Sequence, residues 1–196
     1  MHKYWDSRKH QIYYQALFQM AAVVGKQANS VIDVGSTTGF LNWLHWIDER
    51  VQVDLGPFPE RYRGIKQIQA DFMSSDVPEL KRRYDLCICS QVLEHIDNPQ
   101  PFCAKLLSIA DSLIVSVPYK WREGRVTGHI HDPVDEEKVL MWMGRKPNHS
   151  IVLQEPFGPK RMICWYDPVR GPAFKIEGGF AKEVKRDKWE SLFCGE

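Results

Sequence analysis

The fold is decided at Ser30-Val31-Ile32-Asp33-Val34-Gly35-Ser36-Thr37-Thr38-Gly39, where a short apolar run ends in a glycine-containing turn. β-Branched residues bounded by turn formers predict a buried strand. Gly35 and Gly39 allow the backbone to turn sharply and to approach a ligand closely. The apolar residues that follow recur at helical spacing and predict a helix over 39–48. Because a helix N-terminus presents free N–H groups, this strand–turn–helix unit predicts a site for a nucleotide-type ligand.

The glycine spacing argues against a nicotinamide dinucleotide. A dinucleotide-binding turn reads G-x-G-x-x-G, with its acidic residue roughly 20 positions later. Here the pattern is D-x-G-x-x-x-G, and Asp33 stands before the first glycine. A nicotinamide-dependent oxidoreductase is therefore a weak interpretation of this chain.

The same residues resemble the first motif of the class I S-adenosylmethionine-dependent methyltransferases, [D/E]-x-G-x-G-x-G. Asp33, Gly35 and Gly39 match it, and Thr37 stands where the middle glycine usually lies. The resemblance runs from about residue 4 to about residue 167. It implies a Rossmann-like, doubly wound α/β fold: a seven-stranded, mostly parallel sheet with a C-terminal antiparallel hairpin and helices on both faces. It also implies S-adenosyl-L-methionine as cofactor and S-adenosyl-L-homocysteine as product.

Further acid-terminated strands follow in family order. The resemblance implies that Asp54 binds the two ribose hydroxyls, that Asp71 contacts the adenine amino group and that Phe72 packs on the base. The fourth strand opens at Asp85, which lies on the opposite edge and is expected to be structural, and it ends at Ser90. Taken singly, an acid at a strand end is also a common solvated loop residue. The implied cofactor contacts are Asp33, Gly35, Ser36, Thr37, Gly39, Asp54, Leu55, Asp71, Phe72, Ser90 and Gln91.

Length and composition predict one domain of 196 residues. The resemblance implies that it is a methyltransferase domain, with an N-terminal helix (1–28), a core (30–167) and a polar tail (168–196). A net charge of +1 argues against a nucleic-acid partner bound by bulk electrostatics. Gln15 and Gln19 interrupt the first apolar stretch, which favours an amphipathic helix over a signal peptide or membrane span. The five cysteines form no C-x-x-C pair, as expected of reduced thiols in a cytoplasmic protein.

The remaining pattern alternates strands with helices, as in a parallel sheet with crossover helices. Two apolar runs joined by a turn-rich link predict the closing hairpin. The expected strands lie near 31–34, 51–54, 66–70, 85–90, 112–117, 150–155 and 161–166, and the expected helices near 5–26, 39–48, 99–110, 135–143 and, in the tail, 181–193.

The acceptor is expected beyond the carboxyl ends of the strands, where open α/β sheets bind ligands. The irregular segment 119–133 follows the fifth strand there and mixes aromatic, basic and imidazole groups. Such a loop on a rigid scaffold usually carries specificity, although each of its charged residues can also be merely solvated. Together with the segment after Ser90 it supplies the candidate substrate-binding residues His95, Tyr119, Lys120, Trp121, Arg122 and Arg125.

Methyl transfer to a hydroxyl requires alignment of the acceptor and acceptance of its proton. His129 and His131 are the candidate catalytic bases, because imidazole titrates near neutrality. If the segment is extended, their alternation places both rings on one side; the other interpretation is that they anchor the loop. A metal site at His129, His131, Asp132 and Asp135 is an alternative, but the spacing matches no zinc signature, so no metal is predicted.

The sequence thus predicts a methyltransferase acting on a small-molecule or carrier-linked acceptor, most readily at a hydroxyl of a sugar or an anionic metabolite. Family members that methylate the amino groups of DNA adenine and of glutamine carry an N-P-P-[YF] segment after the fourth strand, and this chain has none. It has Ser90-Gln91-Val92-Leu93-Glu94-His95 there, which resembles the members that methylate small molecules, sugars and lipids. The alternative is a non-catalytic binding or assembly protein of the same fold, which the replacement of the middle glycine by Thr37 favours. Because the chain is small, the first helix, the 119–134 loop or a second copy in a homodimer must cover the cofactor.

Overall fold

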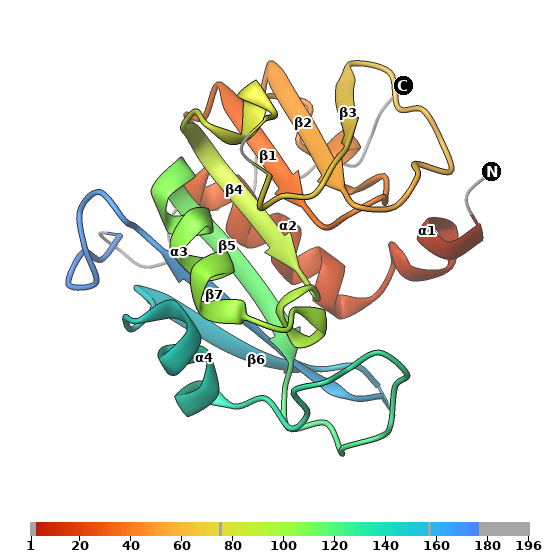
Figure 1. Ribbon diagram of the computed structural model, residues 1–196, viewed down its shortest axis with the longest axis vertical. Helices are drawn as coiled ribbons and strands as arrows, with labels where there is room; N and C mark the ends of the chain where they lie inside the picture. Colours follow the sequence, from red (N-terminus) through yellow and green to blue (C-terminus); the bar gives the residue numbers. More distant parts are fainter. Residues whose placement is uncertain (1–2, 75, 157, 177–196) are drawn as a thin grey trace.

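The computed structural model describes residues 3–74, 76–156 and 158–176 (Figure 1). A seven-stranded sheet forms its centre, with strand order β3-β2-β1-β4-β5-β7-β6. β1 to β5 run parallel, and β7 pairs antiparallel with both β5 and β6. The predicted mostly parallel sheet with a closing hairpin is therefore confirmed. Its strands are β1 (Ser30–Val34), β2 (Glu49–Asp54), β3 (Ile65–Gln69), β4 (Tyr84–Ser90), β5 (Ala110–Pro118), β6 (His149–Gln154) and β7 (Lys160–Tyr166).

Helices cover both faces of the sheet, as the doubly wound prediction requires (Figure 1). α2 (Ile12–Val24) buries its apolar side on one face. α3 (Pro99–Ile109) and α4 (Glu136–Met143) pack on the other. Asp135 caps α4, since its carboxylate accepts the Lys138 N–H at 3.0 Å.

The first predicted helix is divided into α1 (Lys3–Arg8) and α2. The division has a tertiary cause: the Glu155 carboxylate, from the turn between β6 and β7, accepts the backbone N–H groups of Ile12 at 3.1 Å and Tyr13 at 2.9 Å. These donors have no partner inside the helix, so a carboxylate from elsewhere in the chain stabilises a helix start at this point.

The helix predicted over 39–48 is wrong, because only a short 3₁₀ helix, η1 (Phe40–Trp43), forms there. Phe40 and Trp43 contact the ring of Trp5, with centroids 6.4 Å and 5.1 Å away, and Trp46 contacts Phe18 at 5.9 Å. Residues three apart eclipse one another in a 3₁₀ turn, and this spacing directs Phe40 and Trp43 onto the same ring of α1. The turn at 35–39 therefore opens no full α-helix that would attract an anion.

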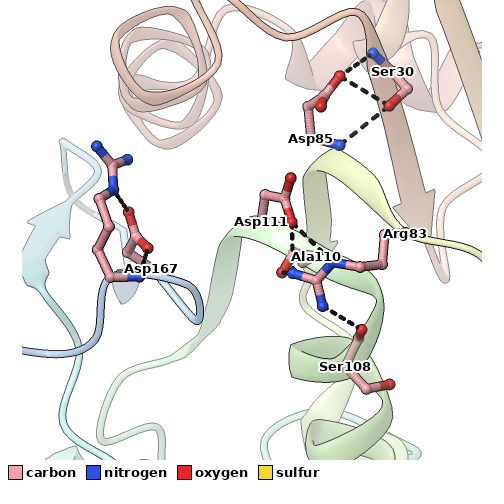
Figure 2. Close-up of polar contacts among 8 residues, drawn as sticks. Ser30, Arg83, Asp85, Ser108, Ala110, Asp111 and Asp167 are labelled. Carbon is pink, nitrogen blue, oxygen red and sulfur yellow. Dashed lines mark hydrogen bonds and ion pairs between the residues drawn. The ribbon is translucent and has the colours of Figure 1, made fainter.

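Polar contacts at the amino edge of the sheet join distant parts of the chain (Figure 2). The Asp85 carboxylate, at the start of β4, accepts hydrogen bonds from the Asn29 and Ser30 N–H groups and from the Ser30 hydroxyl, at 2.8 to 3.0 Å. Arg83 donates to the Asp111 carboxylate and to the carbonyl groups of Ser108, in α3, and Ala110, the first residue of β5. The structural role predicted for Asp85 is thus confirmed.

The helix predicted at 181–193 lies outside the described residues. Within 3–74, 76–156 and 158–176, no helix combines the length and the apolar character needed to cross a membrane.

Candidate active site

A cavity of about 560 Å³ opens at the carboxyl ends of β1, β2 and β4. This is the edge at which ligands of open α/β sheets bind. α1, α2, the 121–129 loop and the hairpin close its other sides. The lining residues are Arg8, Gln11, Tyr13, Tyr14, Leu17, Asp33, Gly35, Ser36, Thr37, Thr38, Phe40, Asp54, Ile88, Ser90, Gln91, Glu94, His95, Trp121, Arg125, Val126, His129, Pro159 and Arg161.

Many of the residues singled out in the sequence meet around this cavity. Those that line it are Asp33, Gly35, Ser36, Thr37, Asp54, Ser90, Gln91, His95, Trp121, Arg125 and His129. Those that do not are Gly39, Leu55, Asp71, Phe72, Tyr119, Lys120, Arg122 and His131.

Four of the expected cofactor contacts have other surroundings. Asp71 accepts the Met73 N–H at 2.8 Å in a surface turn. Phe72 is buried against Phe102, and Leu55 is 74% exposed. A Cβ on Gly39 would lie 2.8 Å from the Trp5 indole nitrogen, so the missing side chain makes room for Trp5.

Asp33 in β1 and Asp54 at the end of β2 form the acidic wall of the cavity. Gly35 has a φ of +76°, which favours glycine. Asp33 is buried, and loss of hydration, with a smaller contribution from the charge of Asp54, raises its pKa to about 7. Asp54 accepts the Gly56 N–H at 2.7 Å through one carboxylate oxygen.

The opposite wall brings together Glu94, His95 and His129. His129 Nδ1 lies 2.8 Å from a carboxylate oxygen of Asp132. His95 Nδ1 donates to the Gly128 carbonyl at 2.8 Å. Glu94 is fully buried, which raises its pKa to about 8. Because both Nδ1 atoms are engaged, each histidine has its Nε2 left for other chemistry.

His131 is separated from His129 by the path of the loop. Its Nε2 donates to the Ile96 carbonyl at 2.8 Å, and its ring lies edge-on to Trp142 with centroids 5.2 Å apart. The His129 N–H bonds back to the Val126 carbonyl at 3.3 Å and closes a turn that ends at His129. The two rings have different partners, and only His129 lines the cavity.

The other loop residues point away from the cavity. The Tyr119 hydroxyl donates to Glu136 at 2.7 Å, and Lys120 lies 3.9 Å from the same carboxylate. Arg122 is exposed. Trp121, in contrast, is buried and stacks on His129, with ring centroids 5.5 Å apart.

Tyr13, Glu94 and Arg161 line the cavity but were not among the sequence candidates. The Tyr13 hydroxyl contacts Ser90 and bonds Ser116 at 2.9 Å, and burial raises its pKa to about 12. Arg161 is buried, with its guanidinium carbon 4.9 Å from the Tyr13 ring and 5.4 Å from that of Trp121. Glu94 could have been predicted, because it stands next to His95 in the sequence. No local pattern predicts Tyr13 and Arg161, because only tertiary packing brings them to the cavity.

Comparisons with known proteins agree with this architecture. The methyltransferase domain family model matches residues 5–175. No curated protein matches the sequence. Among solved structures, the methyltransferase domain of bacterial CtHen1-CN is 20% identical, covers 78% of this chain and 98% of its own, and has a TM-score of 0.55.

Two further structures carry bound product. Burkholderia thailandensis 1,6-didemethyltoxoflavin-N1-methyltransferase, crystallised with S-adenosylhomocysteine, is 16% identical with a TM-score of 0.60, covering 82% of this chain and 80% of that one. The N-terminal domain of EvdMO1, also with S-adenosylhomocysteine, is 11% identical with a TM-score of 0.57, covering 79% and 80%. Together, the family match and the fold show that the chain belongs to the methyltransferase domain family and is an S-adenosylmethionine-dependent methyltransferase.

Proposed function

We propose that this protein transfers the methyl group of S-adenosylmethionine to a hydroxyl of a small or carrier-linked acceptor. One observation carries the proposal: an imidazole held by a carboxylate, His129 on Asp132, lines the same cavity as the acidic wall. Such a pair is suited to activating a hydroxyl, which must lose its proton as it takes the methyl group.

The cofactor fits the acidic wall of the cavity. S-adenosylmethionine carries a sulfonium and an ammonium group, and the carboxyl groups of Asp33 and Asp54 lie on this side. In the proposed mode Asp54 accepts both ribose hydroxyls, and the backbone at Gly35 approaches the methionine portion closely. Ser36, Thr37, Ser90 and Gln91 complete the proposed contacts.

The acceptor fits the opposite wall. The Arg161 guanidinium lies between two aromatic rings, and its Nε has no hydrogen-bond partner among the residues described. A buried guanidinium with a free donor favours an acceptor that carries a carboxylate or phosphate. Trp121 and Arg125 lie at the same wall, and Arg125 stacks over Trp121 at 5.5 Å. An anionic or hydroxylated metabolite is the acceptor class that this wall favours.

In the reaction, the acceptor oxygen attacks the methyl carbon in line with the carbon–sulfur bond. The new carbon–oxygen bond forms as that bond breaks, and the sulfur keeps the electron pair and becomes a neutral thioether. Alignment supplies much of the acceleration. His129 assists removal of the hydroxyl proton, which passes to solvent.

Calorimetric titration tests the cofactor, and product analysis tests the acceptor atom. We expect S-adenosylmethionine and S-adenosylhomocysteine to bind one to one, and NAD, the control, not to bind. Incubation with hydroxylated carboxylates and sugar phosphates should then give methyl ethers detectable by mass spectrometry. Methylation at nitrogen or sulfur alone would contradict the hydroxyl assignment, and failure of both cofactor forms to bind would favour the non-catalytic alternative.

A further inference from the structure

Three metal-ligating side chains converge on one point of the cavity wall. Glu94 and His95 follow β4 in the short 3₁₀ helix η3 (Leu93–His95), and His129 comes from the loop after β5. A carboxylate oxygen of Glu94 and one ring nitrogen of each histidine all lie within 4.8 Å of one another. Two imidazoles and one carboxylate form the ligand set of open, chemically active metal sites.

Each histidine is oriented as a metal ligand would be. A carbonyl oxygen only accepts, so the bond to Gly128 requires His95 to carry its proton on Nδ1. Asp132 favours the same tautomer in His129. Both Nε2 lone pairs are therefore available. Metal-bound histidines almost always donate their other ring N–H to a carboxylate or carbonyl in this manner.

Glu94 is the third reason to place a cation here. Its side chain is fully buried, and neither carboxylate oxygen bonds another described residue. Buried carboxylates are ordinarily paired or coordinate metals, since an unpaired one is costly. Arg161 acts on Glu94 through its charge but forms no ion pair with it among the described residues; its ion pair is with Glu155, at 4.0 Å.

A single ion fits only after the three side chains move closer together. Ligand atoms about 2.1 Å from a shared cation lie about 3.4 Å apart in a tetrahedral arrangement, so a pair separated by up to 4.8 Å must close by up to about 1.4 Å. Three protein ligands leave coordination positions open. All three residues line the cavity, so these positions face the space assigned to the acceptor.

We propose that Glu94, His95 and His129 bind one first-row divalent cation, such as Mn²⁺ or Co²⁺, which coordinates the acceptor hydroxyl. This inference rests on the proposed function and names the means by which His129 activates the hydroxyl. Coordination makes the hydroxyl more acidic. Its proton leaves to solvent, and the oxygen then takes the methyl group as described above.

The site differs from the metal alternative considered in the sequence, which joined His129 to His131, Asp132 and Asp135. His131 gives its Nε2 to the Ile96 carbonyl, and Asp135 caps α4. Asp132 bonds Nδ1 of His129 and so orients the ring without being a ligand itself. Only His129 of that set faces the cluster.

The test is a titration of the full chain, first stripped with EDTA, with Mn²⁺ followed by electron paramagnetic resonance and calorimetry. We expect one equivalent to bind, and Glu94→Gln and His129→Gln each to weaken binding by at least about 10-fold. His131→Gln is the matched control and should bind as the unaltered chain does. Mg²⁺ should compete poorly, because imidazole prefers first-row transition metals. Thermal unfolding of each variant checks that it is folded.

Absence of saturable Mn²⁺ binding, or binding unchanged in both Glu94→Gln and His129→Gln, would overturn the cation site. Titrating the same samples with S-adenosylhomocysteine separates this result from failure of the proposed function. If the product binds but Mn²⁺ does not, the cation alone is refuted. If Mn²⁺ binds and the product does not, the cofactor assignment fails. Folded protein that binds neither overturns both.

Discussion

Asp132 holds the ring of His129, with Oδ2 2.8 Å from Nδ1 and the two side chains only 2% and 6% exposed. His131, two residues along the loop, is bound through the other ring nitrogen. Two histidines that look equivalent in the sequence are thus fixed in opposite orientations. The difference decides which of them presents an unoccupied nitrogen to the cavity.

This difference predicts opposite tautomers. In the neutral rings, His129 and His95 should carry their protons on Nδ1, and His131 should carry its proton on Nε2. Long-range ¹H–¹⁵N spectra of the imidazole nitrogens, recorded above pH 8 after metal removal, distinguish the two forms. Asp132→Asn should reduce the preference of His129 and leave His131 unchanged. The same tautomer at 129 and 131 would be incompatible with the loop described here.

Replacing Asp54 by Ala should weaken S-adenosylhomocysteine binding about 10- to 100-fold, because hydrogen bonds to a charged acceptor contribute about 1.5–3 kcal/mol. Asp71→Ala is the matched control, because Asp71 lies in a surface turn outside the cavity and should leave the affinity nearly unchanged. Calorimetry measures both. The reverse ranking would place the adenosine beside Asp71 and contradict the proposed cofactor position.

The buried Asp33 carboxyl predicts a pH-dependent stability. Its pKa is about 7 in the folded chain, against a usual value of 3.8, so the folded chain binds more protons between these values. The free energy of unfolding should therefore fall as the pH rises from about 4 to about 7, with a contribution from Asp33 on the order of 4 kcal/mol. Asp33→Asn should remove this contribution and so reduce the slope of the profile, while the buried Glu94, whose pKa is also raised, keeps a dependence of the same sign.

Urea denaturation at pH 5 and pH 8 measures the effect, with Asp54→Asn as the control. Asp54 is only half-buried, so its replacement should leave most of the pH dependence in place. An equal dependence in Asp33→Asn and the unaltered chain would mean that Asp33 is ionised in the fold.

Asp85→Ala should lower the free energy of unfolding by about 1–3 kcal/mol, because three donors at the start of β1 lose their shared acceptor. Asp85→Asn keeps an accepting oxygen and should cost less. Asp111→Ala, on the same edge, removes an exposed ion pair with Arg83 and should cost no more than about 1 kcal/mol (Figure 2). Equal costs for Asp85→Ala and Asp111→Ala would argue against the assigned role.

The sequence alone determined the sheet and the place of the cavity. Period and turn signals located all seven strands to within a few residues, since a buried strand is encoded by a short local run. The acids Asp33 and Asp54 followed from the strand ends, because parallel strands bring their carboxyl ends to one edge. The family resemblance rested on this order of acid-terminated strands.

The predicted helix at 39–48 failed for a reason that no local pattern contains. Apolar spacing alone does not distinguish an α-helix from a short 3₁₀ helix. The conformation here depends on the contacts of Trp43 with Trp5 and of Trp46 with Phe18. The division of the first helix likewise depends on Glu155, more than 140 residues away.

Only the tertiary structure decided which of the candidate residues line the cavity. It brought Glu94 and His95 close to His129, placed His129 but not His131 in the lining, added Arg161 to it and left Asp71 outside it. Side-chain direction in an irregular loop follows from the contacts that the folded chain makes, such as those of His129 with Asp132 and of His131 with Ile96. A sequence records which groups are available, whereas the packing of distant segments fixes which of them meet.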